Sequence, residues 1–258
     1  MSVSIGSKPI VTSGLTHLYD QLSPKSMPSG SEVWYNHLPS SYAEKNAKYS
    51  PSGTKAGLAT YGSKTEHARL KGYDTYDGSG DYWNFTDNNV NQQPIQQFPM
   101  TFIIWARHTK ADTSTRALGG FTGNNASYYY GYFQVYYTGS KLKPYWKFEP
   151  QTSFANVAMD VDLDNQWHMW CVRETSGAVR DFTLDAGDFG SVTSTYNVST
   201  PWEFNASCDN FDIGNAQTGD SYDNSWLGDI GPWYIFNRSI SDSEVRQMYD
   251  ANKDRFNL

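Results

Sequence analysis

The sequence predicts an all-β fold that ends in one short helix. The chain has 258 residues and is rich in rings, with 19 Tyr, 13 Phe and 9 Trp, which pack well on the pleated surface of a sheet. Its 21 Gly and 11 Pro supply the turns between strands. We expect a polar N-terminal arm at residues 1–13 and a single domain at residues 14–258, since β-rich domains of this length commonly stay undivided.

The C-terminal segment predicts a buried strand that runs directly into a capped helix. Residues 226–236 are apolar at almost every position, so both faces of this strand should be covered. Ser241 is a favoured helix N-cap, and Glu244 three residues later completes a capping box. We therefore expect a helix at about residues 242–253.

Alternation and turn signals predict further strands along the rest of the chain. In chain order they are 14–20, 98–105, 117–121, 128–137, 142–148, 167–173, 181–185 and 210–215. Residues 37–75 are polar and aperiodic, and residues 190–210 are expected to be mostly connection. Three tryptophans on the predicted strands are expected to be core residues, namely Trp105, Trp167 and Trp233.

Four motifs occur in the order known from one family, at 76–83, 98–105, 167–185 and 226–245. They resemble laminin-G-like, concanavalin A-type domains. This resemblance implies a two-sheet antiparallel jelly-roll sandwich with one short C-terminal helix. The opening segment 14–36 is similar to the start of laminin-G-like modules in tailed-phage virion proteins, which extends the resemblance to almost the whole chain.

Charge and composition exclude several functional classes. A net charge of −7 argues against nucleic-acid binding, which needs a basic face. No apolar run reaches the roughly 20 residues that span a bilayer, and the first residues lack the apolar core of a secretory signal. Cys171 is expected to be a buried free thiol, and a disulfide with Cys208 stays an alternative.

No catalytic set is evident. Asp160, Asp162 and Asp164 recur with the period of a strand, as in the acidic triads of some glycosidases. All three are the shorter Asp, and no second acidic set accompanies them, so we expect a solvated loop here. The five histidines are scattered without the spacing of a zinc site. The sequence therefore predicts a protein that is not an enzyme.

No cofactor is required by any motif, but calcium stays open as an alternative. Related sandwiches hold one calcium in a rim loop, through carboxylates and backbone carbonyls. Asp77 and Asp223 lie near the matching strand ends and are the candidate ligands.

An aromatic run supplies the candidate contact surface. Alternate residues of a strand lie on opposite faces, so about half of such a run points outward unless both faces are covered. Outward rings make platforms for sugars or for protein partners. The candidate surface residues are Tyr128, Tyr130, Tyr132, Tyr145 and Trp146, and burial inside the sandwich is the alternative.

Two functional hypotheses follow. The first is a non-enzymatic structural protein on the surface of a tailed-phage particle, in capsid decoration or in the tail or fibre, which attaches the particle to its host. Its partners would be other virion proteins and further copies of itself. The alternative is a lectin-like, carbohydrate-binding module that recognises a cell-surface glycan, a role for which the fold family supplies only analogy.

Overall fold

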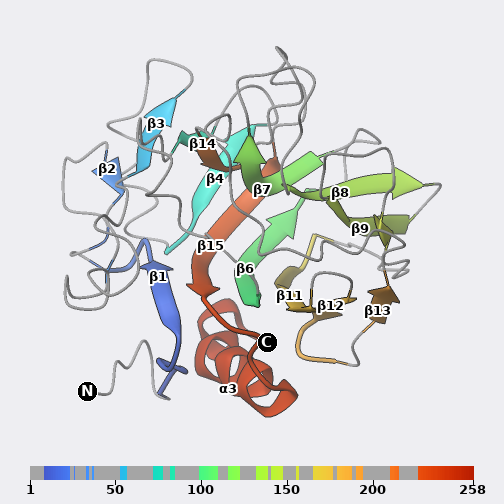
Figure 1. Ribbon diagram of the computed structural model, residues 1–258. Coiled ribbons are helices and arrows are strands. Elements are labelled where there is room, and N and C mark those ends of the chain that lie inside the picture. The colour runs from blue at the N-terminus through green and yellow to red at the C-terminus, as the bar shows by residue number, and fades with distance from the viewer. Residues whose placement is uncertain are drawn as a thin grey trace.

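The fold is mostly antiparallel β-strand with one short helix near the C-terminus (Figure 1). The computed structural model describes residues 9–23, 26, 33–34, 37, 53–56, 72–77, 82–84, 99–109, 116–122, 132–138, 141–147, 155–156, 165–176, 179–187, 190–193, 210–214 and 226–258. All statements below concern these residues. They confirm the predicted all-β class and the C-terminal helix.

The described strands form two sheets. The seven-stranded sheet has the order β1-β15-β6-β11-β12-β13, and β4 pairs with the first part of β15. Its strands are β1 (Leu15–Tyr19), β4 (Asp74–Asp77), β6 (Met100–His108), β11 (Trp167–Ser176), β12 (Val179–Leu184), β13 (Gly190–Thr193) and β15 (Leu227–Phe236).

The second sheet has eight strands in the order β10-β9-β8-β7-β14-β5-β3-β2. These strands are β2 (Val33–Trp34), β3 (Gly53–Ala56), β5 (Tyr82–Asn84), β7 (Arg116–Thr122), β8 (Tyr132–Thr138), β9 (Lys141–Lys147), β10 (Ala155–Asn156) and β14 (Asn210–Ile213). Strands β8 and β9 pair with each other from Tyr132 with Lys147 to Thr138 with Lys141.

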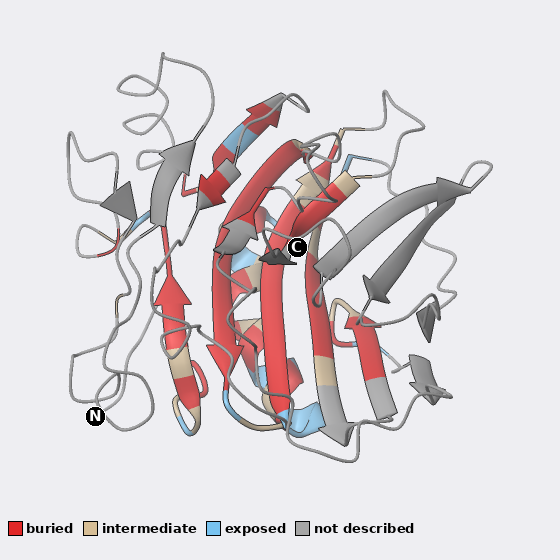
Figure 2. Cartoon of the chain, turned by 45° about the horizontal axis from the view of Figure 1, so that its top comes forward, coloured by how far each residue is buried: buried red, intermediate tan, exposed pale blue. Residues whose placement is uncertain are grey.

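The central strands of the seven-stranded sheet are buried on both faces, as their apolar sequence predicts (Figure 2). On one face, Ile103 and Trp105 of β6 belong to a core cluster with helical residues such as Met248. On the other face, Phe102 and Ile104 are at most 3% exposed. Strand alternation therefore places two separate layers of apolar side chains on this one sheet.

Helix α3 (Asp242–Asn252) and the following 3₁₀ turn η2 (Lys253–Phe256) cover one face of this sheet (Figure 1). The Trp105 ring stacks on Phe256, with ring centroids 4.8 Å apart, and on Tyr249 at 5.7 Å. Trp167 also stacks on Phe256, at 4.3 Å. Aromatic packing thus joins the helical segment to β6 and β11.

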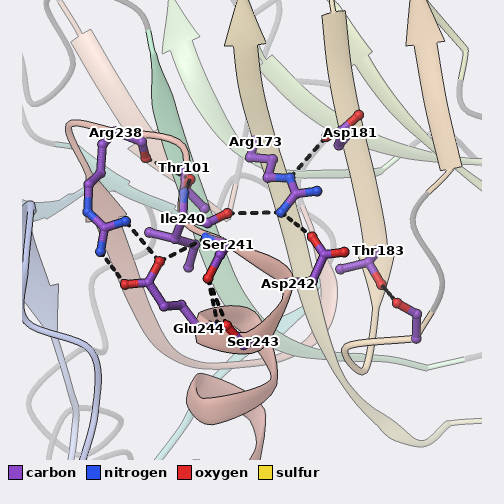
Figure 3. A network of polar contacts seen from close by, with 11 residues as sticks. Thr101, Arg173, Asp181, Thr183, Arg238, Ile240, Ser241, Asp242, Ser243 and Glu244 are labelled. Carbon is purple, nitrogen blue, oxygen red and sulfur yellow. Dashed lines mark hydrogen bonds and ion pairs between the residues drawn. The ribbon is translucent and has the colours of Figure 1, made fainter.

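Polar contacts set where α3 begins (Figure 3). The Ser241 hydroxyl accepts from the Glu244 N–H at 3.3 Å, and the Glu244 carboxylate accepts from the Ser241 N–H at 2.8 Å. Arg238 donates two hydrogen bonds to the same carboxylate, at 2.8 and 2.5 Å. The capping box is therefore joined by a bidentate ion pair to Arg238, two residues beyond the end of β15.

The described end of the expected N-terminal arm packs on the domain. Ile10 and Val11 are only 4% and 6% exposed and belong to the core cluster beside α3. The apolar pair explains this, because burying two branched side chains offsets the entropy of ordering a short segment. Residues 1–8 lie outside the described part of the chain.

Two further observations complete the fold. Cys171 on β11 is buried and carries a free thiol, while Cys208 lies outside the described residues. Within the described part of the chain, no helix is both long and apolar enough to cross a membrane.

Candidate functional site

The structure describes only three of the five residues in the predicted aromatic surface. Tyr128 and Tyr130 lie outside the described residues, while Tyr132 belongs to β8, and Tyr145 and Trp146 belong to β9. Tyr132 is paired with Lys147, and Tyr145 with Gln134, two residues further along β8.

Trp146 is paired with Phe133 of β8. Tyr132, Tyr145 and Trp146 therefore stay predicted contact residues on β8 and β9.

The predicted metal ligands do not form a described site. Asp77 ends β4, and Asp223 lies outside the described residues, as do Asp160, Asp162 and Asp164. Among the residues that can be described, no group of three or more His, Cys, Asp or Glu side chains could hold a metal ion.

The residues predicted to be structural lie inside the packed body. Trp105 and Trp233 are fully buried, and Trp167 is 8% exposed. Ser241 and Glu244 form the helix cap described above.

A polar row that sequence reasoning missed crosses four neighbouring strands at one end of the seven-stranded sheet. Register places Trp167 of β11, Arg107 of β6, Asp229 of β15 and Thr75 of β4 side by side. Arg107 Nε donates to Asp229 Oδ2 at 2.8 Å, and Arg107 Nη2 donates to the same oxygen. The Thr75 hydroxyl donates to Asp229 Oδ1 at 2.6 Å. We call these four residues the rim row.

Aromatic faces flank the guanidinium of this row. The Arg107 guanidinium carbon lies 5.5 Å from the ring centroid of Trp167 and 5.8 Å from that of Tyr73. The Arg107 side chain is 30% exposed, whereas that of Asp229 is 6% exposed. The partly exposed Arg107 guanidinium is suited to vicinal hydroxyl groups, which can accept hydrogen bonds from it, and the partly buried Tyr73 ring beside it is suited to the C–H face of a sugar.

Two signals in the sequence point to this row. Arg107 and Asp229 each interrupt a segment that is otherwise apolar, and a charged residue inside such a strand must find a partner. Their pairing depends on strand order, which the sequence alone does not supply. The row therefore becomes visible only once β6 and β15 are neighbours.

A histidine and a carboxylate are paired nearby on β11. His168 Nδ1 lies 2.6 Å from Asp185 Oδ2, and Asp185 Oδ1 accepts from the Met169 N–H at 2.8 Å. Asp185 has the left-handed φ of 55° in the turn after β12, which aims its carboxylate back at β11. Within the described part of the chain, no Ser, Thr or Cys side chain is hydrogen-bonded to His168, so the pair has no nucleophile there.

Comparisons with known proteins identify relatives in fold only. No family model matches the sequence, and no curated protein matches it. A Trypanosoma rangeli sialidase in complex with sialic acid matches with a TM-score of 0.61 at 11% identity, over 98% of this chain and 36% of that one. A mutant of that sialidase displaying trans-sialidase activity matches with a TM-score of 0.64 at 12% identity, over 97% and 35%.

A third structure matches almost from end to end. Domain 4 of AbnA, a GH43 extracellular arabinanase from Geobacillus stearothermophilus, in complex with arabinotriose, has a TM-score of 0.53 at 11% identity. The match covers 91% of this chain and 98% of that domain. By contrast, the chain spans about a third of the length of the sialidases. At these identities the likeness establishes a shared fold.

These matches contradict one prediction. We expected a protein that is not an enzyme, but the structures that share its fold come from a sialidase and an arabinanase. The prediction rested on the lack of a catalytic motif in the sequence. That reasoning fails because catalytic groups can come from separate strands and loops that no short motif records. A shared fold does not assign a reaction, so hydrolysis is tested directly below.

Proposed function

We propose that this chain is a carbohydrate-binding module that recognises a glycan on a cell surface. The observation that carries this proposal is the match to an arabinanase domain whose structure holds arabinotriose. That match covers 91% of this chain and 98% of the arabinanase domain. The sialidase matches support the same class of ligand.

The proposed architecture is the jelly-roll sandwich implied by the sequence motifs, in which the eight-stranded sheet covers the face of the other sheet that α3 leaves free. Burial of Phe102, Ile104 and Trp233 on that face supports it. So does the hydrogen bond of 2.9 Å from Trp83 Nε1 on β5 to Asp74 Oδ2 on β4, which joins the two sheets.

The rim row is the proposed sugar contact among the described residues. Arg107 keeps part of its guanidinium accessible, and Thr75 is exposed beside it. Tyr73 supplies a partly exposed ring next to these polar groups. Planar polar groups beside a ring form the usual chemistry of a sugar subsite. Tyr132 and Tyr145 on β8 and β9 are the second proposed contact.

Glycan-array screening followed by isothermal titration calorimetry tests the function, with arabinotriose as the first soluble probe. Arg107→Lys keeps the charge but removes the planar fork, so we expect affinity to fall about tenfold, or roughly 1.4 kcal/mol. Arg238→Lys is the matched control, because it makes the same change in an ion pair beside α3. Tyr145→Ala tests the second contact.

The outcomes separate function from location. Binding that is weakened by Arg107→Lys and unchanged by Arg238→Lys supports the rim row. Equal losses in both variants would reject the row as the contact. The absence of any glycan ligand on the array and in calorimetry would reject the proposed function. Release of reducing sugar from bound glycans would add hydrolysis to binding.

The surface of a tailed-phage particle remains our proposed location. Its support is the resemblance of segment 14–36 to laminin-G-like modules in virion proteins. In that setting, glycan recognition would serve host attachment, and the partners would be other virion proteins and further copies of the chain. Mass spectrometry of purified particles tests this location, and the chain's absence from them would reject it.

A further inference from the structure

A buried histidine at the end of β6 has no hydrogen-bond partner among the described residues. His108 is 1% exposed, and neither of its ring nitrogens is hydrogen-bonded there. The indole N–H of Trp226, which is fully buried, also has no partner in the described part of the chain. The two rings meet edge to face, with centroids 5.1 Å apart. Buried polar groups that lack partners in a native protein call for an explanation, such as a ligand.

The backbone holds these two rings together. The Trp226 N–H donates to the Gly214 carbonyl at 2.7 Å, and the Gly214 N–H donates to the Leu118 carbonyl at 2.8 Å. Gly228 lies opposite His108 on β15 and has a φ of +138°. A Cβ at Gly228 would lie 2.1 Å from the Arg107 carbonyl oxygen, so only glycine allows the β15 backbone to approach β6 this closely beside His108.

One positively charged side chain lies near His108. Arg116, the first residue of β7, is close enough for its charge to act on His108. Burial and this charge lower the pKa of His108 to about 4, so the imidazole is neutral at pH 7. Burial also lowers the pKa of Arg116. Burial is the main cause of both shifts, and a carboxylate beside Arg116 would favour the charged form of each group.

The chemistry of these groups favours a carboxylate. The indole N–H and one imidazole N–H are donors, and a carboxylate accepts hydrogen bonds from both through two oxygens. Charge-assisted hydrogen bonds are stronger than neutral ones, so a carboxylate gains more here than a hydroxyl group does. Arg116 supplies the opposite charge nearby.

We propose that His108 and Trp226 bind the carboxylate of an acidic sugar unit, with Arg116 as the nearby positive charge. The proposal rests on the proposed function and specifies its ligand class as glycans that contain a sugar acid. The site lies at the same end of the seven-stranded sheet as the rim row, because Arg107 and His108 are adjacent at the end of β6.

The test compares one sugar in its charged and neutral forms. We would titrate the wild-type chain with a galacturonic acid oligomer, with the methyl ester of that oligomer, and with acetate and inorganic phosphate alone. We expect the acid oligomer to bind at least tenfold more tightly than its ester. We also expect the imidazole pKa of His108, followed by NMR, to rise by at least one unit when the acid oligomer is bound.

Two variants locate the effect. Trp226→Phe keeps the ring and removes the N–H, and we expect it to remove most of the preference for the acid oligomer. Trp105→Phe is the matched control, since it makes the same change in a buried tryptophan on the helix-covered face. His108→Gln provides a second variant if Trp226→Phe does not fold, and the comparison of acid with ester requires no variant.

Each outcome decides between the proposals. Equal binding of the acid and the ester would overturn this inference and leave the proposed function intact. Binding of acetate or phosphate as tightly as the acid oligomer would indicate a simple anion site and would also overturn it. A chain that binds no sugar in either form would count against both proposals.

Discussion

At the residue scale, Arg173 and Arg107 differ in how far their hydrogen-bond donors are used inside the fold. Arg173 is 11% exposed, and it donates to Asp181 at 3.0 Å and to the Ile240 carbonyl at 2.9 Å (Figure 3). These contacts satisfy the guanidinium inside the protein and tie β11 to the start of α3. Arg107 is 30% exposed, with part of its donor fork left accessible. Arg107 can therefore donate a hydrogen bond to a ligand, whereas the donors of Arg173 are hydrogen-bonded within the protein.

Glu244 gives a prediction at this scale. Hydrogen bonds from Arg238, and then from Ser241, lower the pKa of Glu244 from 4.5 to about 2. A depressed carboxyl pKa means that the ion pair stabilises the fold fully above pH 4.5 and loses its contribution as pH falls toward 2. At pH 7, Glu244→Gln should lower the free energy of unfolding by about 1 kcal/mol, because the group is partly exposed.

Urea unfolding at pH 7 and pH 3 measures this effect. The difference in unfolding free energy between wild type and Glu244→Gln should be smaller at pH 3 than at pH 7. At pH 3 the Glu244 carboxyl is mostly protonated in the unfolded chain but still mostly ionised in the folded chain, so unfolding takes up a proton. A difference that is the same at both pH values would show that the Arg238 pair does not set the titration of Glu244.

At the element scale, sequence reasoning succeeds where one residue pattern determines one local structure. The apolar segment 226–236 predicts β15, and the structure places this strand at Leu227–Phe236. The predicted helix at 242–253 corresponds to α3, which ends at Asn252 and continues as η2. Both elements carry their own signals, a two-faced apolar strand and a capping box.

Short and edge elements could not be predicted in the same way. β13 consists of Gly190–Thr193, in a region expected to be connection, and β10 has only two residues. Such strands exist because a neighbouring strand supplies hydrogen bonds, which is tertiary information. The rim row could not be predicted for the same reason, because Arg107 and Asp229 become partners only when β6 and β15 are neighbours in the sheet.

A substitution of Trp233 tests the packing of β15, which pairs with both β1 and β6. Its ring is fully buried and stacks on Tyr19 at 4.2 Å, with Phe102 edge-on at 6.1 Å. Trp233→Ala should lower the free energy of unfolding by roughly 3–5 kcal/mol, through lost burial and the cavity left behind. Leu22→Ala, at a residue that is 44% exposed, should change it by less than about 0.5 kcal/mol.

Denaturant unfolding monitored by circular dichroism compares these two variants. A loss below about 1 kcal/mol for Trp233→Ala would mean that this ring does not support the packing between β15 and β1.

At the scale of the whole molecule, the fold limits where ligands can bind. The seven-stranded sheet is buried on both faces along its central strands (Figure 2). At one end of it, the partly exposed Arg107 lies beside the buried His108 and Asp229. The net charge of −7 does not oppose an acidic ligand at this end, because local groups dominate over a Debye length of about 10 Å.

Buried histidines make the stability of the whole molecule depend on pH. His17 on β1 is 3% exposed, and burial lowers its pKa from 6.5 to about 3. Below pH 6.5 the unfolded chain takes up a proton at this position that the folded chain excludes until about pH 3. Stability is therefore complete above pH 6.5 and falls as the pH drops through this window, by up to about 1.4 kcal/mol per pH unit.

His17→Phe tests this linkage because it keeps a flat ring beside Tyr19, with which His17 stacks at 6.4 Å. The unfolding free energy of wild type and variant should be measured with urea at pH 6.5, 5.5 and 4.5. We expect the unfolding free energy of the variant to change less with pH, by about 1.4 kcal/mol per pH unit. This is the contribution of the one proton that the unfolded chain binds at His17 and the folded chain does not. His108, whose pKa is also lowered, keeps some slope in the variant. Identical slopes in the two proteins would mean that the buried His17 ring takes up its proton without unfolding.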